Sequence, residues 1–242
     1  MLLENEIQRI DDNTALPAAG EMLLPVGEAA LGASLALPED AAGLVILAQS
    51  SGSGRFNPRT RRIAGLLYRG RMATLLLDLL TPAEHELDCE TAQFRLNVPR
   101  LAARLMAAID WATRDLRVGG LPLGLFAAHT AAAAAAIVAA AERPAAVSAV
   151  VCCGGRLDLA GGSLWRVAAP TLLMAGENDP VLLNINRSAA HELSAIHALE
   201  IVPAAADLMS DPLALPQVAL LSRVWFQRHL RAPASRHRTA AH

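Results

Sequence analysis

The chain has 242 residues, a length that suits one large α/β domain with a substantial buried core. Its formal net charge at pH 7 is -2 and it has no basic face, which argues against a nucleic acid as partner. Hydrophobic residues make up 53% of the chain, but no apolar run approaches the ~18 residues of a membrane-spanning helix, so we expect no membrane segment.

The first twenty residues contain four acidic side chains and lack a basic start followed by an apolar stretch. We therefore expect no secretory signal and a cytoplasmic protein. Two of the three cysteines are the adjacent pair Cys152 and Cys153, which fits neither a disulfide framework nor a metal-ligand spacing. We divide the chain into an N-terminal extension (1–20), one domain (21–231) and a flexible C-terminal tail (232–242).

Short apolar runs alternate with longer amphipathic ones along the chain, which is typical of βα units and a parallel sheet. Strands are predicted at residues 21–26, 31–37, 43–48, 72–77, 122–127, 147–152, 170–175 and 199–203. Helices are predicted at residues 58–68, 94–114, 130–142, 184–195 and 212–230. Because few residues join the first two strands, these should pair antiparallel, whereas the later strands need crossover helices. The pattern predicts an α/β fold with a mostly parallel eight-stranded sheet and helices on both faces.

The strand predicted at 122–127 turns directly into an alanine-rich helix. In the motif G-x-S-x-G, a sharp strand-to-helix turn exposes a nucleophilic serine between small neighbours. This chain reads Ala127-Ala-His-Thr-Ala131 at the turn. Small residues therefore flank the apex on both sides, and His129 stands where the serine would be.

Further motifs surround this turn. The loop after the third strand reads Gln49-Ser-Ser-Gly-Ser-Gly-Arg55 and then Asn57-Pro-Arg-Thr60, and the next strand ends in Leu75-Leu-Leu-Asp-Leu-Leu-Thr-Pro82. These stretches resemble the H-G-S-G-S-S-R, S-P-R-N and L-L-x-D-L-L-T-P motifs of the bacterial dienelactone hydrolase-related group of α/β-hydrolases. Residues 154–160, 169–179 and 224–230 match the same pattern. The resemblance covers about residues 21–231 and implies an α/β-hydrolase fold without a large cap domain.

The resemblance also implies where a catalytic triad would lie. His129 occupies the nucleophile position, Asp179 the position of the acid, and Asp207 the position of the histidine base. The oxyanion-loop or ligand-binding positions are Gln49, Ser50, Ser51, Gly52, Ser53 and Thr130, and Gln49 replaces a family histidine. Because the nucleophile and the base are both replaced, we expect a non-catalytic pseudoenzyme or a small-ligand binding protein.

A rebuilt catalytic site is the alternative. A loop serine could attack an ester or lactone with His129 as base and Asp179 or Asp207 as the orienting acid, and His85 is a second candidate base. The structural alternative for the loop is that its hydroxyls cap the helix that begins near Pro58.

A divalent metal on His129, Asp179 and Asp207 is another route to hydrolysis, unless these side chains only hydrogen-bond one another. Cys152 and Cys153 end a strand near the same rim, where they are either a thiolate source or small buried hydrophobic residues.

The ligand and partners are predicted only in outline. The helix after His129 and the amides of the glycine-serine loop would favour an anionic small molecule, although every hydrolase of this fold has such donors in its oxyanion hole. We expect no cofactor and no metal, no nucleic acid or membrane partner, and a monomer or homodimer. The remaining hypothesis is an interaction subunit, which would function through contacts on its surface rather than through its pocket.

Overall fold

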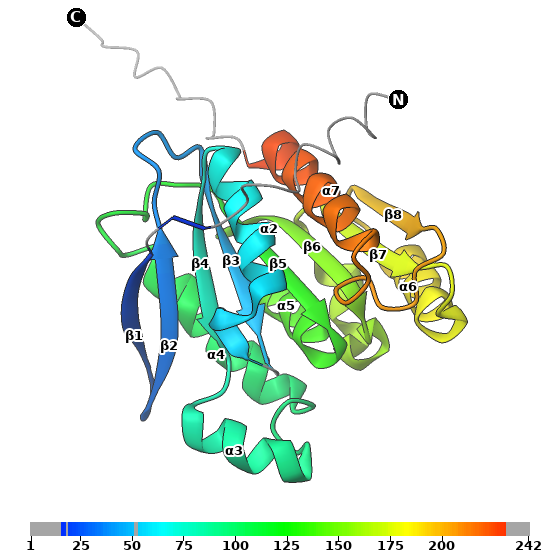
Figure 1. The fold of residues 1–242 in the computed structure, drawn as a ribbon, viewed down its shortest axis with the longest axis horizontal. Coiled ribbons are helices and arrows are strands. Elements are labelled where there is room, and N and C mark those ends of the chain that lie inside the picture. Colours follow the sequence, from blue (N-terminus) through cyan, green and yellow to red (C-terminus); the bar gives the residue numbers. More distant parts are fainter. Residues whose placement is uncertain (1–15, 18, 51–52, 231–242) are drawn as a thin grey trace, which may run out of the picture.

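The computed structural model describes residues 16–17, 19–50 and 53–230, and gives the backbone alone for residues 129 and 130 (Figure 1). Its strands are β1 (Gly20–Val26), β2 (Ala29–Ala36), β3 (Gly43–Gln49), β4 (Met72–Asp78), β5 (Leu123–His129), β6 (Val147–Gly155), β7 (Thr171–Gly176) and β8 (His197–Val202). Its α-helices are α2 (Pro58–Arg69), α3 (Pro82–Thr91), α4 (Val98–Ala112), α5 (Thr130–Glu142), α6 (Pro180–Glu192) and α7 (Ala214–His229). Two further 3-10 segments are η1 (Gly54–Phe56) and η2 (Leu157–Arg166).

In the described part of the chain one eight-stranded sheet has the order β1-β2-β4-β3-β5-β6-β7-β8. β1 pairs antiparallel with β2, and β2 antiparallel with β4, while the remaining neighbours are parallel. The predicted sheet and the predicted antiparallel first pair are therefore confirmed. Parallel strands bring their carboxyl ends to one edge of the sheet, which is where ligands bind in open α/β sheets.

Helices cover both faces of the sheet, as the sequence predicted. α2 and α7 pack on one face and are in front in Figure 1, where α4 and α5 lie behind the sheet. Two separate clusters of buried side chains result, one beneath α2 and α7 and one beneath α4, α5 and η2. Leu16 is 8% exposed and belongs to the first of these clusters, so core packing begins before β1.

The starts of two helices differ from prediction by four residues, and one helix was missed. α4 begins at Val98 rather than near Phe94, and α6 begins at Pro180 rather than near Asn184. Each of these helices starts behind a polar N-cap, Asn97 for α4 and Asp179 for α6, whose side chain accepts a backbone N–H of the first turn. The missed helix, α3, buries only Asp88, so it has no apolar stripe to reveal it in the sequence.

The alanine-rich helix α5 packs close against the sheet. Its residues 131–136 are completely buried. A Cβ atom added to Gly155, at the end of β6, would clash with the Cβ atom of Ala133. The small side chains are thus required by the short distance between helix and strand.

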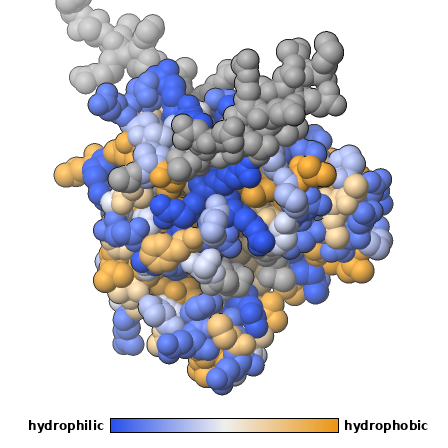
Figure 2. All heavy atoms as spheres, viewed as in Figure 1, coloured by the Kyte–Doolittle hydropathy of each residue, from blue (hydrophilic) through white to orange (hydrophobic). Residues whose placement is uncertain are grey.

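No helix among the described residues combines the length and apolar character needed to cross a bilayer. On the face seen in Figure 2, hydrophilic and hydrophobic residues are interspersed.

We expect Gly155→Ala to lower the free energy of unfolding by about 1–3 kcal/mol, because the added methyl overpacks the contact with Ala133. Urea denaturation measures the change. Gly162→Ala is the matched control, since a Cβ there meets only Trp165 at ordinary contact distance, and its effect should stay within about 0.5 kcal/mol. Equal stabilities for the two variants would contradict the close packing of α5 on β6.

Candidate functional site at the carboxyl edge of the sheet

The predicted site residues lie along the carboxyl edge of the sheet. Gln49 is the last residue of β3, and His129 is the last residue of the neighbouring strand β5. Asp179 follows β7, and Asp207 lies in the loop after β8. The fold therefore brings the predicted positions to one edge, although Ser51 and Gly52 lie outside the described residues and the side chains of His129 and Thr130 are not described.

Gln49 anchors the first turn of α2 beneath the edge. Its side chain is 8% exposed, its Nε2 donates to the carbonyl of Ala48 at 3.0 Å, and its Oε1 accepts from Thr60 Oγ1 at 3.2 Å. α2 itself is capped by Asn57, whose side chain accepts the N–H of Arg59 at 2.9 Å. The prediction that serine hydroxyls cap this helix is therefore wrong, because Asn57 directly precedes Pro58 and satisfies the first free N–H.

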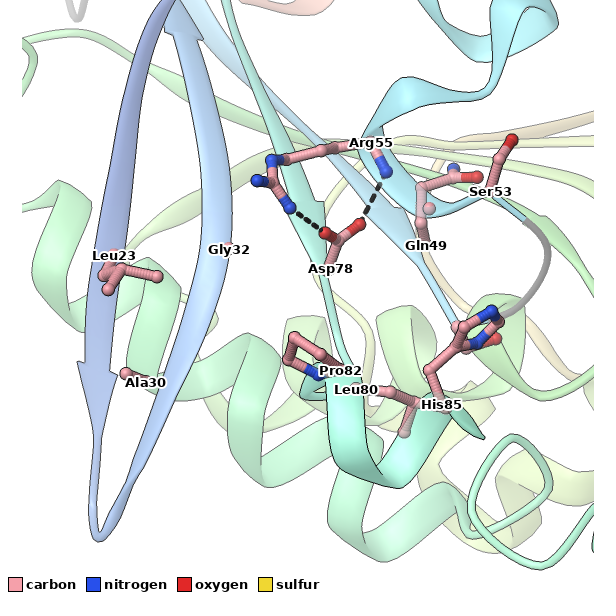
Figure 3. A pocket seen from close by; sticks show the side chains of 12 residues that line it. Leu23, Ala30, Gly32, Gln49, Ser53, Arg55, Asp78, Leu80, Pro82 and His85 are labelled. Atoms are coloured by element: carbon pink, nitrogen blue, oxygen red, sulfur yellow. Dashed lines mark hydrogen bonds and ion pairs between the residues drawn. The ribbon is translucent and has the colours of Figure 1, made fainter. Parts of the chain in front are cut away.

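The loop after β3 is held by an ion-pair cluster that the sequence analysis did not single out (Figure 3). The backbone N–H and the guanidinium Nη1 of Arg55 each donate to the Asp78 carboxylate at 2.5 Å. Arg55 Nε donates to Glu21 at 2.9 Å, and Ser34 Oγ donates to the other Glu21 oxygen at 2.6 Å. One arginine thus joins the loop to β4 and to the β1–β2 hairpin.

Two glycines make room for this cluster. A Cβ atom at Gly32 would clash with the Arg55 guanidinium, and one at Gly54 would clash with the Asp78 carboxylate. Gly54 also has φ +56°, a left-handed conformation that other residues seldom adopt. The glycines therefore give the guanidinium and the loop backbone direct access to the carboxylates.

The two carboxylates respond differently to the same arginine. Burial raises the pKa of Asp78 although Arg55 opposes it. Burial acts in the same direction on Glu21, but hydrogen bonds from Ser34 and Arg55 outweigh it and lower its pKa. The difference follows exposure, since the Asp78 side chain is 17% exposed and that of Glu21 is 50% exposed.

A cavity of about 280 Å³ opens beside this cluster (Figure 3). Its polar wall comes from the ends of β3 and β4, the loop between β3 and α2, and the start of α3, and contains Gln49, Ser50, Ser53, Asp78 and His85. Its apolar wall comes from the β1–β2 hairpin and the segment after β4, and contains Leu23, Ala30, Leu80 and Pro82. Of the predicted site, the cavity contains Gln49, Ser50, Ser53 and the second candidate base His85, and it adds Arg55 and Asp78.

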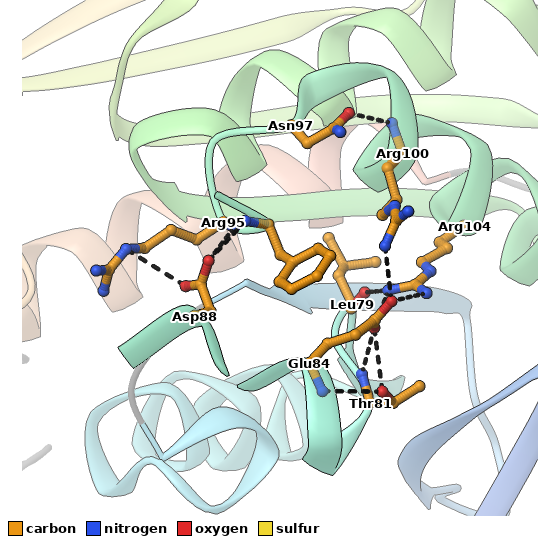
Figure 4. Close-up of polar contacts among 9 residues, drawn as sticks. Leu79, Thr81, Glu84, Asp88, Arg95, Asn97, Arg100 and Arg104 are labelled. Carbon is orange, nitrogen blue, oxygen red and sulfur yellow. Dashed lines mark hydrogen bonds and ion pairs between the residues drawn. The ribbon is translucent and has the colours of Figure 1, made fainter. Parts of the chain in front are cut away.

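A second polar cluster holds the segment that carries His85 (Figure 4). Glu84 accepts hydrogen bonds from Arg104 at 2.6 and 2.7 Å and from Arg100 at 2.8 Å, and its side chain completes a capping box with Thr81. The Arg104 bonds lower the pKa of Glu84 from 4.5 to about 2, against the opposing effect of burial. The buried Asp88 accepts the N–H groups of Phe94 and Arg95 at 2.7 and 2.9 Å.

The two aspartates of the predicted triad stabilise turns. Asp179 Oδ1 accepts the N–H of Leu182 at 2.9 Å, and Asp207 Oδ1 accepts the N–H groups of Met209 and Ser210 at 3.0 and 3.3 Å. Neither residue lines the cavity. Over the residues that the structure describes, no group of three His, Cys, Asp or Glu side chains could hold a metal ion.

The adjacent cysteines at the end of β6 are buried thiols. Burial raises the pKa of Cys152 to about 12 and raises that of Cys153 further, to which the charge of Asp207 adds. Cys153 therefore remains protonated near neutral pH, and the structure favours the buried-hydrophobe interpretation over a thiolate source. Cys89 on α3 is exposed, with its Sγ 4.0 Å from His85 Nε2.

Comparison with known proteins agrees with this architecture. No family model matches the chain. A dienelactone hydrolase from Anabaena variabilis has 42% sequence identity and a TM-score of 0.84, covering 88% of this chain and 100% of that one. The structure of Est1E from Butyrivibrio proteoclasticus shares the fold, with 12% identity and a TM-score of 0.68, and the match covers 85% of this chain and 99% of that one.

Longer relatives also match. Proteins of two Mycobacterium tuberculosis strains, named "Putative phosphoribosyl transferase", are 40% identical over 213 residues, which are 88% of this chain and 47% of theirs. The chain therefore spans about half the length of the curated relatives it matches. The solved structures establish the α/β-hydrolase fold for the present chain.

We expect Glu84→Gln to lower the free energy of unfolding at pH 7 by about 1–3 kcal/mol, since it leaves Arg104 with a neutral partner. The folded-state pKa lies below the unfolded value, so the carboxylate stabilises fully above about pH 4.5 and progressively less as the pH falls toward 2. Denaturant titrations at several pH values should show the two proteins converging in acid.

The control for this experiment is Glu142→Gln, which removes an exposed pair with Arg166 and should cost under about 0.5 kcal/mol. A constant difference between Glu84→Gln and wild type from pH 7 to pH 3 would contradict the assigned role of the ionised Glu84.

Thiol accessibility provides a separate test of the cysteine assignment. In the native protein we expect a thiol reagent to modify Cys89 rapidly and to leave Cys152 and Cys153 unmodified, because both are buried and protonated. All three should react in denaturant. Peptide mass spectrometry identifies the modified residue, and native labelling of Cys153 would contradict the assignment.

Proposed function

The chain belongs to the dienelactone hydrolase family, and from this premise we propose that it binds a small ligand and does not perform serine-dependent hydrolysis. The observation that carries the proposal is the cavity at the carboxyl edge, which retains the loop positions Gln49, Ser50 and Ser53. The elbow position holds His129 instead of serine, and the base position holds Asp207 instead of histidine. Loop positions of the predicted site therefore still line a cavity, although Gln49 replaces the family histidine there and two triad positions hold other residues.

The contacts of the remaining triad positions support this proposal. Acyl transfer needs a nucleophile, a base that takes its proton and an acid that orients the base. Asp179 and Asp207 each accept backbone N–H bonds within their own turns, and both lie outside the lining of the cavity. A fold supports many chemistries, so membership of a hydrolase family does not by itself supply the reaction.

A specific observation favours one alternative, a hydrolase with a rebuilt site. Ser50, Ser53 and His85 line the same cavity, so a loop serine could attack an ester or lactone with His85 as the base. His129, with a loop serine or a metal ion, is the other version of this alternative.

The setting of the protein is part of the proposal. We place it in the cytoplasm as a monomer or homodimer that binds a small molecule and needs no nucleic acid, membrane, metal or cofactor. The relatives named for phosphoribosyl transfer are about twice as long as the matched segment. We therefore assign ligand binding to the hydrolase-fold segment and do not extend the transfer reaction to it.

The test is hydrolysis of a panel of short-chain aryl esters and lactones by the purified protein. We expect turnover no greater than that of a heat-inactivated sample. A matched thermal-shift screen of uncharged and charged small molecules should find a ligand that is not consumed. At about 100 times its Kd, such a ligand adds about 2.7 kcal/mol, roughly 5–10 °C for a domain of this size.

If turnover does appear, three single variants identify its origin, namely His129→Ala, His85→Ala and Ser53→Ala. Saturable turnover abolished by one of them would replace the binding function with a rebuilt hydrolase and identify its base or nucleophile. Turnover that is unchanged in all three variants would indicate a contaminant.

A further inference from the structure

The cavity beside β4 has balanced charge. Besides the imidazole of His85, its described lining contains two ionisable side chains, Arg55 and Asp78, and these bind each other (Figure 3). Behind them, Glu21 binds Arg55 and is also within electrostatic range of Arg61. Two carboxylates and two guanidinium groups therefore compensate one another without a ligand.

Arg55 has little charge to offer a ligand. Its backbone N–H and Nη1 donate hydrogen bonds to Asp78, and its Nε donates to Glu21. One face of its guanidinium group stacks on the Phe56 ring, with the guanidinium carbon 4.2 Å from the ring centre. A carboxylate entering the cavity would meet an arginine already shared by two carboxylates. It would lose hydration without gaining an uncompensated cation, which is an unfavourable exchange in a partly enclosed space.

The polar wall nevertheless offers hydrogen bonds to uncharged groups. Each Asp78 oxygen accepts one bond from Arg55 and has a second lone pair. The Gln49 amide uses one donor and one acceptor within the fold and keeps one of each. Hydroxyl groups of Ser50 and Ser53 add further donors and acceptors on the same side.

The rest of the lining is hydrocarbon and is formed by Leu23, Ala30, Leu80 and Pro82. The cavity volume of about 280 Å³ is at the small end of ligand sites. We propose that the cavity accepts an uncharged, monosaccharide-sized ring compound that carries both hydroxyl and apolar groups, and that it discriminates against carboxylates of the same size. This ligand class rests on the proposed binding function and opposes the preference for anions expected from the loop amides and the helix after His129.

A matched pair of probes separates the two expectations. Pantolactone is an uncharged hydroxy-lactone with two methyl groups on its ring, and pantoate is the ring-opened carboxylate of the same skeleton. Both are titrated into the full chain at pH 8, above the usual range of imidazole protonation, with binding read from protein NMR shifts. We expect pantolactone to bind at least about tenfold more tightly than pantoate.

Two surface variants test the cause of the discrimination. Glu21→Gln removes one compensating carboxylate beside Arg55, so it should strengthen pantoate binding by about threefold or more and change pantolactone binding by less than about twofold. Asp40→Asn removes a similarly exposed carboxylate, which pairs with Arg71 before the start of β4, and should leave both affinities unchanged.

The outcomes distinguish this inference from the proposed function. Equal or tighter binding of pantoate overturns the inference and indicates an anion site. Absence of saturable binding by pantolactone also overturns it. In that case the thermal-shift screen still decides whether the protein binds another ligand. Saturable consumption of pantolactone contradicts the non-catalytic function but supports the uncharged ligand class.

Discussion

The two hydrogen bonds from Arg55 to the Asp78 carboxylate determine the shape of the candidate site. They fix the loop after β3 relative to β4, and the Nε bond to Glu21 extends the connection to the β1–β2 hairpin. The arrangement requires glycine at positions 32 and 54. A methyl group at Gly32 would clash with the Arg55 guanidinium, and one at Gly54 would clash with the Asp78 carboxylate. The cavity wall and its charge balance both follow from this one ion pair.

The part of the cavity lining that comes from α3 depends on a second polar network. Glu84 with Arg104, and Asp88 with the backbone of Phe94 and Arg95, hold the polar helix α3 against α4 (Figure 4). α3 has almost no apolar contact surface of its own. Its position therefore depends on charge-assisted hydrogen bonds, which are directional and place His85 at the cavity.

The two aspartates at the predicted triad positions stabilise local structure. Asp179 caps α6 and Asp207 closes the turn after β8, so both carboxylates contribute to local structure. The sheet and the alanine-rich helix are held together by packing, so this part of the fold does not depend on which residue occupies the elbow. The family relationship and the proposed binding function are thus consistent.

The sequence by itself determined the strands, most of the helices and the elbow at His129, because these follow from local apolar periodicity and from small residues at a sharp turn. It also placed Gln49, Ser50 and Ser53 at the site through family motifs. Only the tertiary structure decided that Asp78, Arg55 and His85 share a cavity with them, and that Asn57 rather than a serine caps α2. These contacts join residues brought together by strand order and by polar networks, and the geometry of a polar network leaves no periodic signal in the chain.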